Sequence, residues 1–186
     1  GLRGLYYIVR AAVRNDGLAL QFASTQQKNS SALVTDAVSN DGLALQYATT
    51  RVQDLYQVVK AAVNQDGMAL EFASDFLKRD LEVVRDAVRN NGLALQHASS
   101  TMKADAFLVE DAVKKDGLAL EYASEDLRND AAIVILAVQE DGMALEFASE
   151  NLKGQLYIVE AAFQQDAASV RFASDAVRQV LEGGSF

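Results

Sequence analysis

The chain has 186 residues, half of them apolar, with a formal net charge of −9 and a pI near 4.6. This acidic balance argues against nucleic acid as a partner, because phosphate contacts require a positive surface. The chain has no cysteine and one histidine, which excludes disulfides, thiolate metal sites and the usual nucleophile–base pairs of enzymes. No apolar run reaches the roughly 18–20 residues that cross a bilayer, so we expect a soluble protein. The start at Gly1 rather than Met leaves open an organellar location after removal of a targeting segment.

One motif, Asp-Gly-Leu-Ala-Leu, returns every 25 residues without insertion or deletion. It begins at Asp16 and recurs, with small changes, at the positions of Asp41, Asp66, Asn91, Asp116, Asp141 and Asp166. Other positions keep the same phase, and the alanine seven residues after Asp16 is identical in all seven units. Such a period is the signature of a repeat architecture in which each unit packs on its neighbours.

The first element of each unit is predicted to be an amphipathic helix of about eleven residues. In the unit 80–104 the segment 80–90 has apolar residues with helical spacing, at Leu81, Val83, Val84, Ala87 and Val88. Four units place a capping side chain before this helix, namely Ser30, Asp80, Asp105 and Asp130.

A turn and a shorter helix are expected to follow. In the same unit, Asn91-Gly92 should end the first helix, with the glycine in the left-handed conformation. The segment 93–102 is then predicted to form a second helix that buries Ala98 and Met102. The alanine positions predict close approach of the helices, and a larger residue at Ala87 or Ala98 is expected to force units apart.

These elements predict an all-α fold, an elongated and curved α-solenoid of about seven two-helix repeats. The whole chain, 1–186, is expected to be one array. The units lie near 5–29, 30–54, 55–79, 80–104, 105–129, 130–154 and 155–179, with a frayed tail at 180–186.

Three columns, each made of equivalent positions in successive repeats, are candidates for functional sites. The Asp column is better explained by helix capping than by a metal ladder, because its members should lie about one helix-pair spacing apart, too far to share a calcium ion. A basic column could bind anions, but cations at a helix end also complement exposed carbonyl groups. The basic column comprises Lys28, Lys78, Lys103, Arg128, Lys153 and Arg178.

The third column is aromatic and is expected to be the large half of the core. Its members are Phe22, Tyr47, Phe72, His97, Tyr122, Phe147 and Phe172. His97 is interpreted as a space-filling replacement rather than a ligand or a base. No metal, cofactor or catalytic group is expected, and the chain is predicted not to be an enzyme.

Departures from the repeat carry the partner prediction. In the segment 130–140, Ile135 and Leu136 occupy positions that are mostly polar or alanine in other units, which makes this helix apolar nearly all round. Such helices are covered by something: a partner, a second copy or a folded-back terminus. The candidate interface is Ile135, Leu136, Ala132, Tyr6, Tyr7, Phe76, Phe107 and Tyr157.

The segments NNGLALQHAS, KKDGLALEYASEDLRND and AVQEDGMALEFASENLK resemble the repeats of Domain of Unknown Function 4116. The resemblance covers nearly the whole chain and is weakest at 25–35 and 166–186. It implies a source among bacteria, protists or algae, and it brings no catalytic residues.

Two functional hypotheses remain. The favoured one is a structural or scaffold subunit that docks on a multi-subunit complex through its repeat surface, with contact to a membrane complex left open. The alternative is a peptide-binding adaptor that reads a partner segment along a concave face, using polar positions such as Arg10, Lys60, Arg85 and Glu110.

Overall fold

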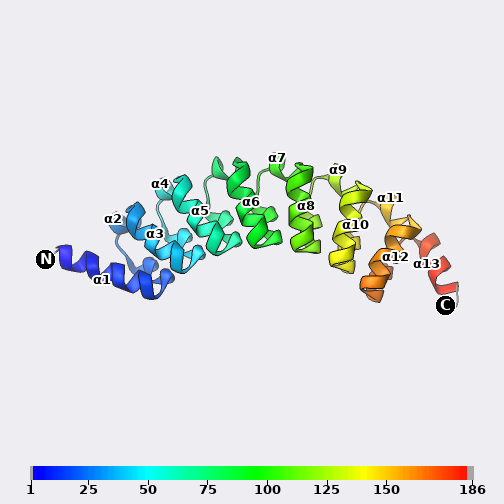
Figure 1. Ribbon diagram of the computed structural model, residues 1–186, viewed down its shortest axis with the longest axis horizontal. Helices are drawn as coiled ribbons and strands as arrows, with labels where there is room; N and C mark the ends of the chain where they lie inside the picture. Colours follow the sequence, from blue (N-terminus) through cyan, green and yellow to red (C-terminus); the bar gives the residue numbers. More distant parts are fainter. Residues whose placement is uncertain (1, 184–186) are drawn as a thin grey trace. The chain divides into compact units, whose positions relative to one another are not determined.

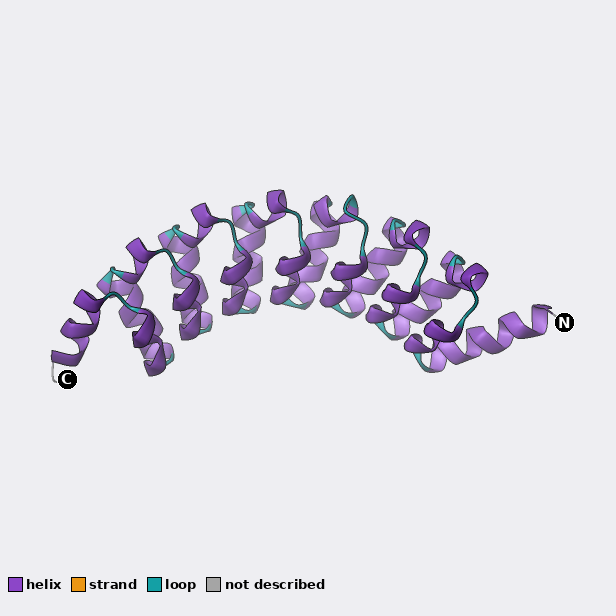
Figure 2. Ribbon diagram, turned by 180° about the vertical axis from the view of Figure 1, so that it is seen from behind, coloured by secondary structure: helices purple, strands orange, loops and turns teal. Residues whose placement is uncertain are grey.

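The computed structural model describes residues 2–183, with side chains from Leu5 to Leu181, and every regular element in that range is a helix. The frayed tail predicted at 180–186 is part of a helix up to Gly183, and 184–186 lie outside the described residues. The chain divides into two compact units, unit 1 (1–99) and unit 2 (100–186). Each unit repeats the same helical motif (Figures 1 and 2), which confirms the all-α repeat fold.

The first helix of each repeat is an α-helix, as predicted. In unit 1 these helices are α1 (Leu2–Asn15), α3 (Ser31–Asn40), α5 (Tyr56–Gln65) and α6 (Leu81–Asn90). In unit 2 they are α8 (Ala106–Lys115), α10 (Ala131–Glu140) and α12 (Leu156–Gln165). The expected caps are present: the side chains of Ser30, Asp80, Asp105 and Asp130 accept hydrogen bonds from the first-turn amides of their helices.

The second helix predicted in each repeat is instead two short pieces. The first piece is a six-residue 3₁₀ helix, in chain order η1 (Gly17–Phe22), η2 (Gly42–Tyr47), η3 (Gly67–Phe72), η5 (Gly92–His97), η6 (Gly117–Tyr122), η7 (Gly142–Phe147) and η8 (Ala167–Phe172). The second piece is α2 (Thr25–Lys28), α4 (Thr50–Gln53), the 3₁₀ helix η4 (Leu77–Arg79), α7 (Ser100–Lys103), α9 (Glu125–Arg128), α11 (Glu150–Lys153) or α13 (Asp175–Gly183).

The break between the two pieces has a local cause. Ala23 closes η1 in an extended conformation, and its N–H donates to the Leu20 carbonyl at 3.0 Å. The next residue, Ser24, is the N-cap of α2, and its hydroxyl accepts from the Gln27 amide. Because a serine cap competes with helix continuation, the chain starts a new helix there rather than extending the first.

The motif glycine does not end the first helix in a left-handed conformation, so that prediction is wrong. No glycine among the described residues has a positive φ. Glycine is needed because the next repeat comes too close for a side chain: a Cβ on Gly17 would lie 2.5 Å from the Ala37 carbonyl oxygen. Gly42 stands in the same relation to Ala62, also at 2.5 Å. The glycine and alanine columns are therefore the two sides of one contact between repeats.

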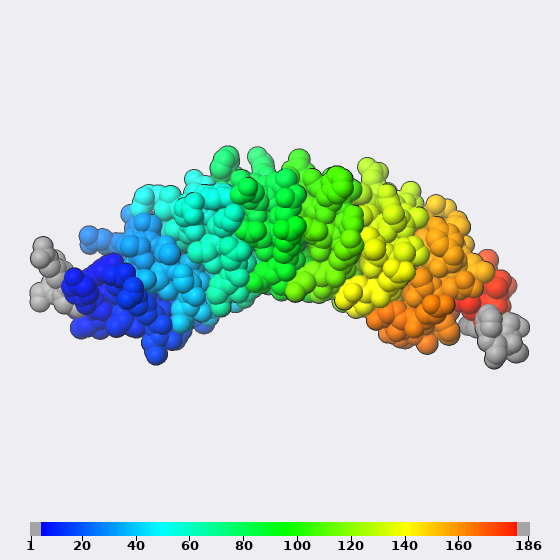
Figure 3. All heavy atoms as spheres, in the orientation of Figure 1, coloured from blue at the N-terminus to red at the C-terminus, as the bar shows by residue number. Residues whose placement is uncertain are grey.

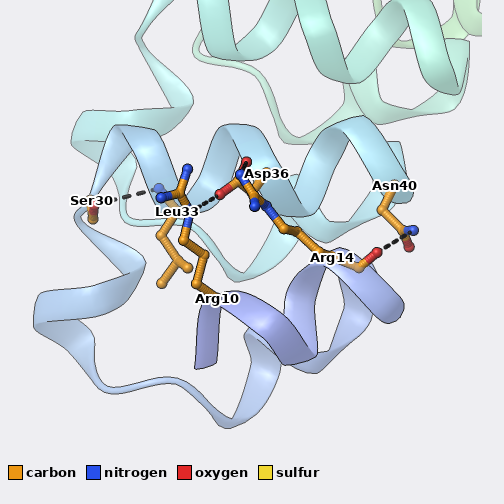
Figure 4. Close-up of polar contacts among 6 residues, drawn as sticks. All are labelled: Arg10, Arg14, Ser30, Leu33, Asp36 and Asn40. Atoms are coloured by element: carbon orange, nitrogen blue, oxygen red, sulfur yellow. Dashed lines mark hydrogen bonds and ion pairs between the residues drawn. The ribbon is translucent and has the colours of Figure 1, made fainter. Parts of the chain in front are cut away.

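Side-chain amides tie this contact together. The Gly17 N–H donates to Asn40 Oδ1 at 2.8 Å, and Asn40 Nδ2 donates back to the Arg14 carbonyl at 3.1 Å (Figure 4). The same two-way clamp is made by Gln65, Asn90 and Gln165 on the repeat before each of them. Glu140 occupies this position in α10, and among the described residues it accepts no such bond from Gly117.

A backbone hydrogen bond joins the short helices of successive repeats. The Thr49 N–H donates to the Lys28 carbonyl at 3.2 Å, and the Ser149 N–H donates to the Arg128 carbonyl at 2.9 Å. The core between repeats consists mainly of buried Leu, Val and Ala side chains. On the face shown in Figure 3 the atoms of neighbouring repeats of each unit meet without an open gap. Ala37, Ala62, Ala87 and Ala98 are all buried, as expected for close packing.

Candidate partner-binding surface

One side of the first helices is left open by the stacking, and we call it the first-helix face. It is formed by the third, sixth and seventh residue of each repeat, which are Tyr7, Arg10 and Ala11 in the first repeat. Residues spaced i, i+3 and i+4 lie on one side of a helix. Because α1, α3, α5 and α6 pack in succession in unit 1, and α8, α10 and α12 in unit 2, the face is continuous within each unit.

In unit 1 this face is mainly polar and carries ion pairs. Arg10 Nε donates to Asp36 Oδ2 at 2.5 Å, and Arg14 Nη2 donates to Asp36 Oδ1 at 3.1 Å (Figure 4). The hydrogen bond from Arg10 is the main cause of a lowered pKa at the Asp36 carboxyl group. The Asp36 side chain is only 18% exposed, so the aspartate is held as an anion by two cations of the preceding helix.

A second polar cluster follows two repeats later on the same face. Tyr56 donates its hydroxyl proton to Glu82 Oε2 at 2.6 Å, and Lys60 Nζ lies 3.3 Å from the same oxygen and 3.4 Å from Asp86 Oδ2. The hydrogen bonds from Tyr56 and Lys60 lower the pKa of Glu82. The hydrogen bonds of Lys60 to Tyr56 and Glu82 in turn raise the pKa of Lys60. Two of the cations proposed for a peptide-reading face, Arg10 and Lys60, are thus already engaged by carboxylates.

A groove with a volume of about 600 Å³ runs between the two clusters. Its lining includes Arg10, Asp36, Leu55 and Tyr56. Since Arg10 is paired with Asp36, the groove offers an anionic ligand little free positive charge.

In unit 2 six of the nine side chains of the same face are apolar, and the other three are the carboxylates Glu110, Asp111 and Glu160. Phe107 is 78% exposed and Tyr157 is 53% exposed, at equivalent positions of α8 and α12. Ala132, at that position on the intervening α10, is also exposed. Ile135 and Leu136 lie on the same side of α10 and are half-buried. We call Phe107, Ala132, Ile135, Leu136 and Tyr157 the apolar patch.

The structure therefore brings together five of the eight residues predicted as an interface. The other three lie in unit 1. Tyr6 and Tyr7 are neighbours on α1, with ring centroids 5.9 Å apart, and Phe76 precedes η4 in the link between repeats. Tyr7 is 66% exposed and Phe76 is 73% exposed, whereas Tyr6 is half-buried.

The members of the basic column make different contacts. Lys28 Nζ donates to the Gln21 carbonyl at 2.8 Å, at the end of η1. Burial lowers the pKa of the Lys103 ammonium group. Lys153 lies 2.8 Å from Glu150, and Arg178 pairs with Asp175.

One groove in unit 2 gathers two members of this column. It has a volume of about 470 Å³ and is lined by Arg128 and Lys153 together with three carboxylates, Glu125, Glu146 and Glu150. The acidic side chains outnumber the cations there, which weakens the case for anion binding.

The Asp column acts as caps, as predicted: Asp16 accepts from the Leu18 amide at 3.0 Å, and Asp141 from the Met143 amide at 2.9 Å. Between residues 2 and 183 no group of three or more acidic, histidine or cysteine side chains is placed to hold a metal ion. In that range no helix has the length and hydrophobicity needed to span a membrane.

The aromatic column is less buried than predicted. Phe22 is 84% exposed, and the remaining members, His97 included, are half-buried. They lie over the edge of the stack rather than in its centre, because alanine and leucine of the 3₁₀ helices fill the core.

The amide clamp was not predicted, although its position in the repeat is mostly Asn or Gln. These residues are Asn15, Asn40, Gln65, Asn90 and Gln165. The sequence signal for this clamp is an Asn or Gln in the last turn of the first helix, directly before the residue that starts the motif.

Comparison with known proteins agrees with the repeat. A family model described as a domain of unknown function (DUF4116) matches residues 7–53, 56–103 and 108–153. Each match spans close to two 25-residue repeats, so the family's unit is a pair of the repeats described above. No curated protein and no solved structure matches the chain. Since the matched segments cover well over half of its residues, the chain belongs to the DUF4116 family.

Proposed function

We propose that this protein is a non-catalytic scaffold subunit that docks on a larger protein assembly through the apolar patch on α8, α10 and α12. One observation carries the proposal. The first-helix face is built from the same repeat positions in both units, yet most of its side chains are polar or charged in unit 1, with ion pairs between repeats, and most are apolar in unit 2.

Stacking of repeats does not account for this difference. Phe107 and Tyr157 are mostly exposed, so they contribute little to the core of unit 2. Aromatic side chains are enriched at protein interfaces because they bury a large area at a small cost in conformational entropy. Ile135 and Leu136 lie between them and give the patch a continuous apolar centre.

The surroundings of the patch indicate the chemistry of its partner. Glu110 and Glu160 occupy the same face beside the apolar side chains, and the whole chain carries a net charge of −9. A protein partner with an apolar centre and a basic rim fits this surface. Because such rim charges mainly accelerate association, the association rate is expected to fall as salt is added.

The experiment compares two variants of the full chain. Phe107→Ser with Tyr157→Ser removes both aromatic anchors, and Tyr7→Ser removes an exposed aromatic at the same repeat position of unit 1. The tagged proteins are recovered from the cells that naturally produce them, and co-purifying proteins are quantified by mass spectrometry.

We expect the double variant to lose specific partners that the wild type and Tyr7→Ser retain, with unchanged helicity by circular dichroism. An identical partner set for all three proteins would reject the patch as the docking surface. Sedimentation of the purified wild type then tells whether the patch binds a second copy: a dimer lost in the double variant would replace the scaffold proposal with self-association.

The adaptor hypothesis has weaker support. Its favourable observation is the groove of about 600 Å³ on unit 1, beside Arg10 and Tyr56. A ligand there has to compete with Asp36 for Arg10, which makes binding of acidic peptides costly.

A further inference from the structure

The apolar patch of unit 2 alternates in side-chain size from one helix to the next. At the third repeat position α8 carries Phe107 and α12 carries Tyr157, whereas α10 between them carries Ala132, which is exposed. α10 packs on both α8 and α12 (Figure 1), so the two aromatic rings lie on either side of it. Because the distance between packed helices depends on the side chains at their contact, a partner's backbone can approach α10 closely at Ala132.

The spacing of these helices fits one helix of a partner. Neighbouring helix axes lie about 8–10 Å apart, which places α8 and α12 about 16–20 Å apart. A helix with its side chains is about 10–12 Å wide, so one helix lying along α10 fits between the two rings, but two do not. Ile135 and Leu136, one turn after Ala132, continue the apolar contact along α10.

The charge of the face adds a second requirement. In unit 1 Arg10 pairs with Asp36, at the seventh position of the next repeat. Glu110 occupies the position of Arg10 on α8, and the seventh position of the next repeat holds Leu136, which cannot pair with it. Glu110 binds Lys114 of its own helix, and its side chain is still 37% exposed. A cation of a partner can therefore take the place that a neighbouring repeat's charged side chain takes in unit 1.

A second copy of this chain does not supply that cation. In a symmetric dimer through this patch, both surfaces are the same. The carboxylates Glu110, Asp111 and Glu160 of one copy would then face the same carboxylates of the other, and such like-charge contacts oppose association.

We propose that the segment docked on the apolar patch is a single amphipathic α-helix of another protein, lying along α10 with a lysine or arginine beside Glu110. This inference rests on the proposed function, because it names what binds at the same patch. The helix buries its apolar stripe against Ala132 and Leu136, and Phe107 and Tyr157 hold it from its two sides.

The test measures binding of synthetic peptides to the purified full chain by fluorescence anisotropy. The lysine peptide has about 18 residues, with leucine and alanine at helical spacing and lysines on both sides of that stripe. The glutamate peptide has glutamate at every lysine position. A reordered peptide has the lysine peptide's composition without the stripe, and a proline peptide has proline at its centre, which breaks the helix.

We expect the wild type to bind the lysine peptide at least about tenfold more tightly than any of the other three. Phe107→Ser with Tyr157→Ser should weaken that binding at least about tenfold, because both aromatic anchors are lost. Circular dichroism of this variant checks that its helices persist.

Glu110→Lys tests the charged contact, and Glu146→Lys is its matched control. Both change the net charge equally, but Glu146 is an exposed residue of η7 and lies outside the first-helix face. We expect Glu110→Lys to lower the preference for the lysine peptide over the glutamate peptide by about tenfold, and Glu146→Lys to change it far less.

The proposal is overturned if the lysine peptide does not bind, if the reordered or proline peptide binds equally well, or if the two lysine variants change the preference equally. Any of these results, together with loss of natural partners in the Phe107 and Tyr157 double variant, would mean that the patch docks a partner of another structure and that the scaffold proposal stands. A dimer through the patch that the lysine peptide cannot dissociate would show instead that the occupant is a second copy.

Discussion

The close contact between repeats makes Gly42→Ala the sharpest test of how the array is held together. The new Cβ would lie 2.5 Å from the Ala62 carbonyl oxygen and 3.0 Å from both the Asp66 Cβ and its backbone nitrogen. All three atoms belong to the next repeat, and two of them are backbone. The collision can be relieved only by moving α3 and α5 apart.

The cost follows from three contributions. Overpacking of a tight contact destabilises by about 1–3 kcal/mol. Separation also breaks the two hydrogen bonds of the Gln65 clamp, one to the Gly42 amide and one to the Asn40 carbonyl, worth about 1 kcal/mol each. Alanine restricts the unfolded chain, which offsets about 0.4–1 kcal/mol. The net loss in the free energy of unfolding is therefore about 2–5 kcal/mol.

Urea unfolding followed by circular dichroism measures the loss, and native-state hydrogen exchange locates it. Because stability in a repeat array adds along neighbouring units, faster exchange is expected in η2 and α5 first. Gly154→Ala is the matched control: its Cβ would meet the Asn151 carbonyl at 3.3 Å within its own repeat, and its φ of −90° suits alanine. If Gly42→Ala is as stable as Gly154→Ala, close approach of the backbones does not govern stacking.

Three further predictions follow from the contacts. Glu140→Gln should complete the missing clamp of α10 and raise the free energy of unfolding by about 1 kcal/mol, whereas Glu146→Gln, with the same change of charge, should not. Asp36→Asn should destabilise at neutral pH, and its difference from wild type should shrink below pH of about 4 and vanish below the folded pKa of Asp36, since a lowered carboxyl pKa stabilises only while the group is ionised; a difference that stays constant with pH would contradict the role of Arg10. Ser169→Ala should stabilise by about 1 kcal/mol in thermal or urea unfolding, because the Ser169 hydroxyl is fully buried and finds no partner among the described residues.

The period and the first helices were predictable because their signals are local. Asp80 and Val84 are a cap and a core position within one helix, and their spacing alone indicates the helix. The Asp column was likewise correctly interpreted as capping, since Asp16 bonds an amide two residues away.

The failed predictions concern contacts between repeats. Gly17 was expected to take a left-handed conformation, but the constraint on it comes from Ala37, twenty residues later. The second helix was expected to be continuous, but Ser24 and its successors begin a new one, and the amides at this position bond the preceding repeat. Neither of these contacts can be inferred from the sequence of one repeat, because each joins two repeats.

The partner prediction was based on Ile135 and Leu136, and the structure shifts the emphasis to their neighbours. Both side chains are half-buried, whereas Phe107 and Tyr157 beside them are open. The sequence groups these residues in one candidate interface, but it does not separate the five on α8, α10 and α12 from Tyr6, Tyr7 and Phe76, because only the packing of adjacent repeats places those five on one face.

The repeat separates two tasks between its positions. Stacking constrains which residues can occupy the glycine, alanine and amide positions. A substitution at any of them changes a contact with the backbone of the neighbouring repeat, as at Gly17 and Ala37. The third, sixth and seventh positions point away from that contact, and there the positions of Arg10 and Asp36 hold Ile135 and Leu136 in α10 while the helices still pack. The first-helix face can vary while the stacking contacts between repeats cannot. This face is therefore where members of a repeat family can differ in the partner that they recognise. In this chain the face is mainly polar in unit 1 and mainly apolar in unit 2, and the apolar part is the surface that we propose a partner buries.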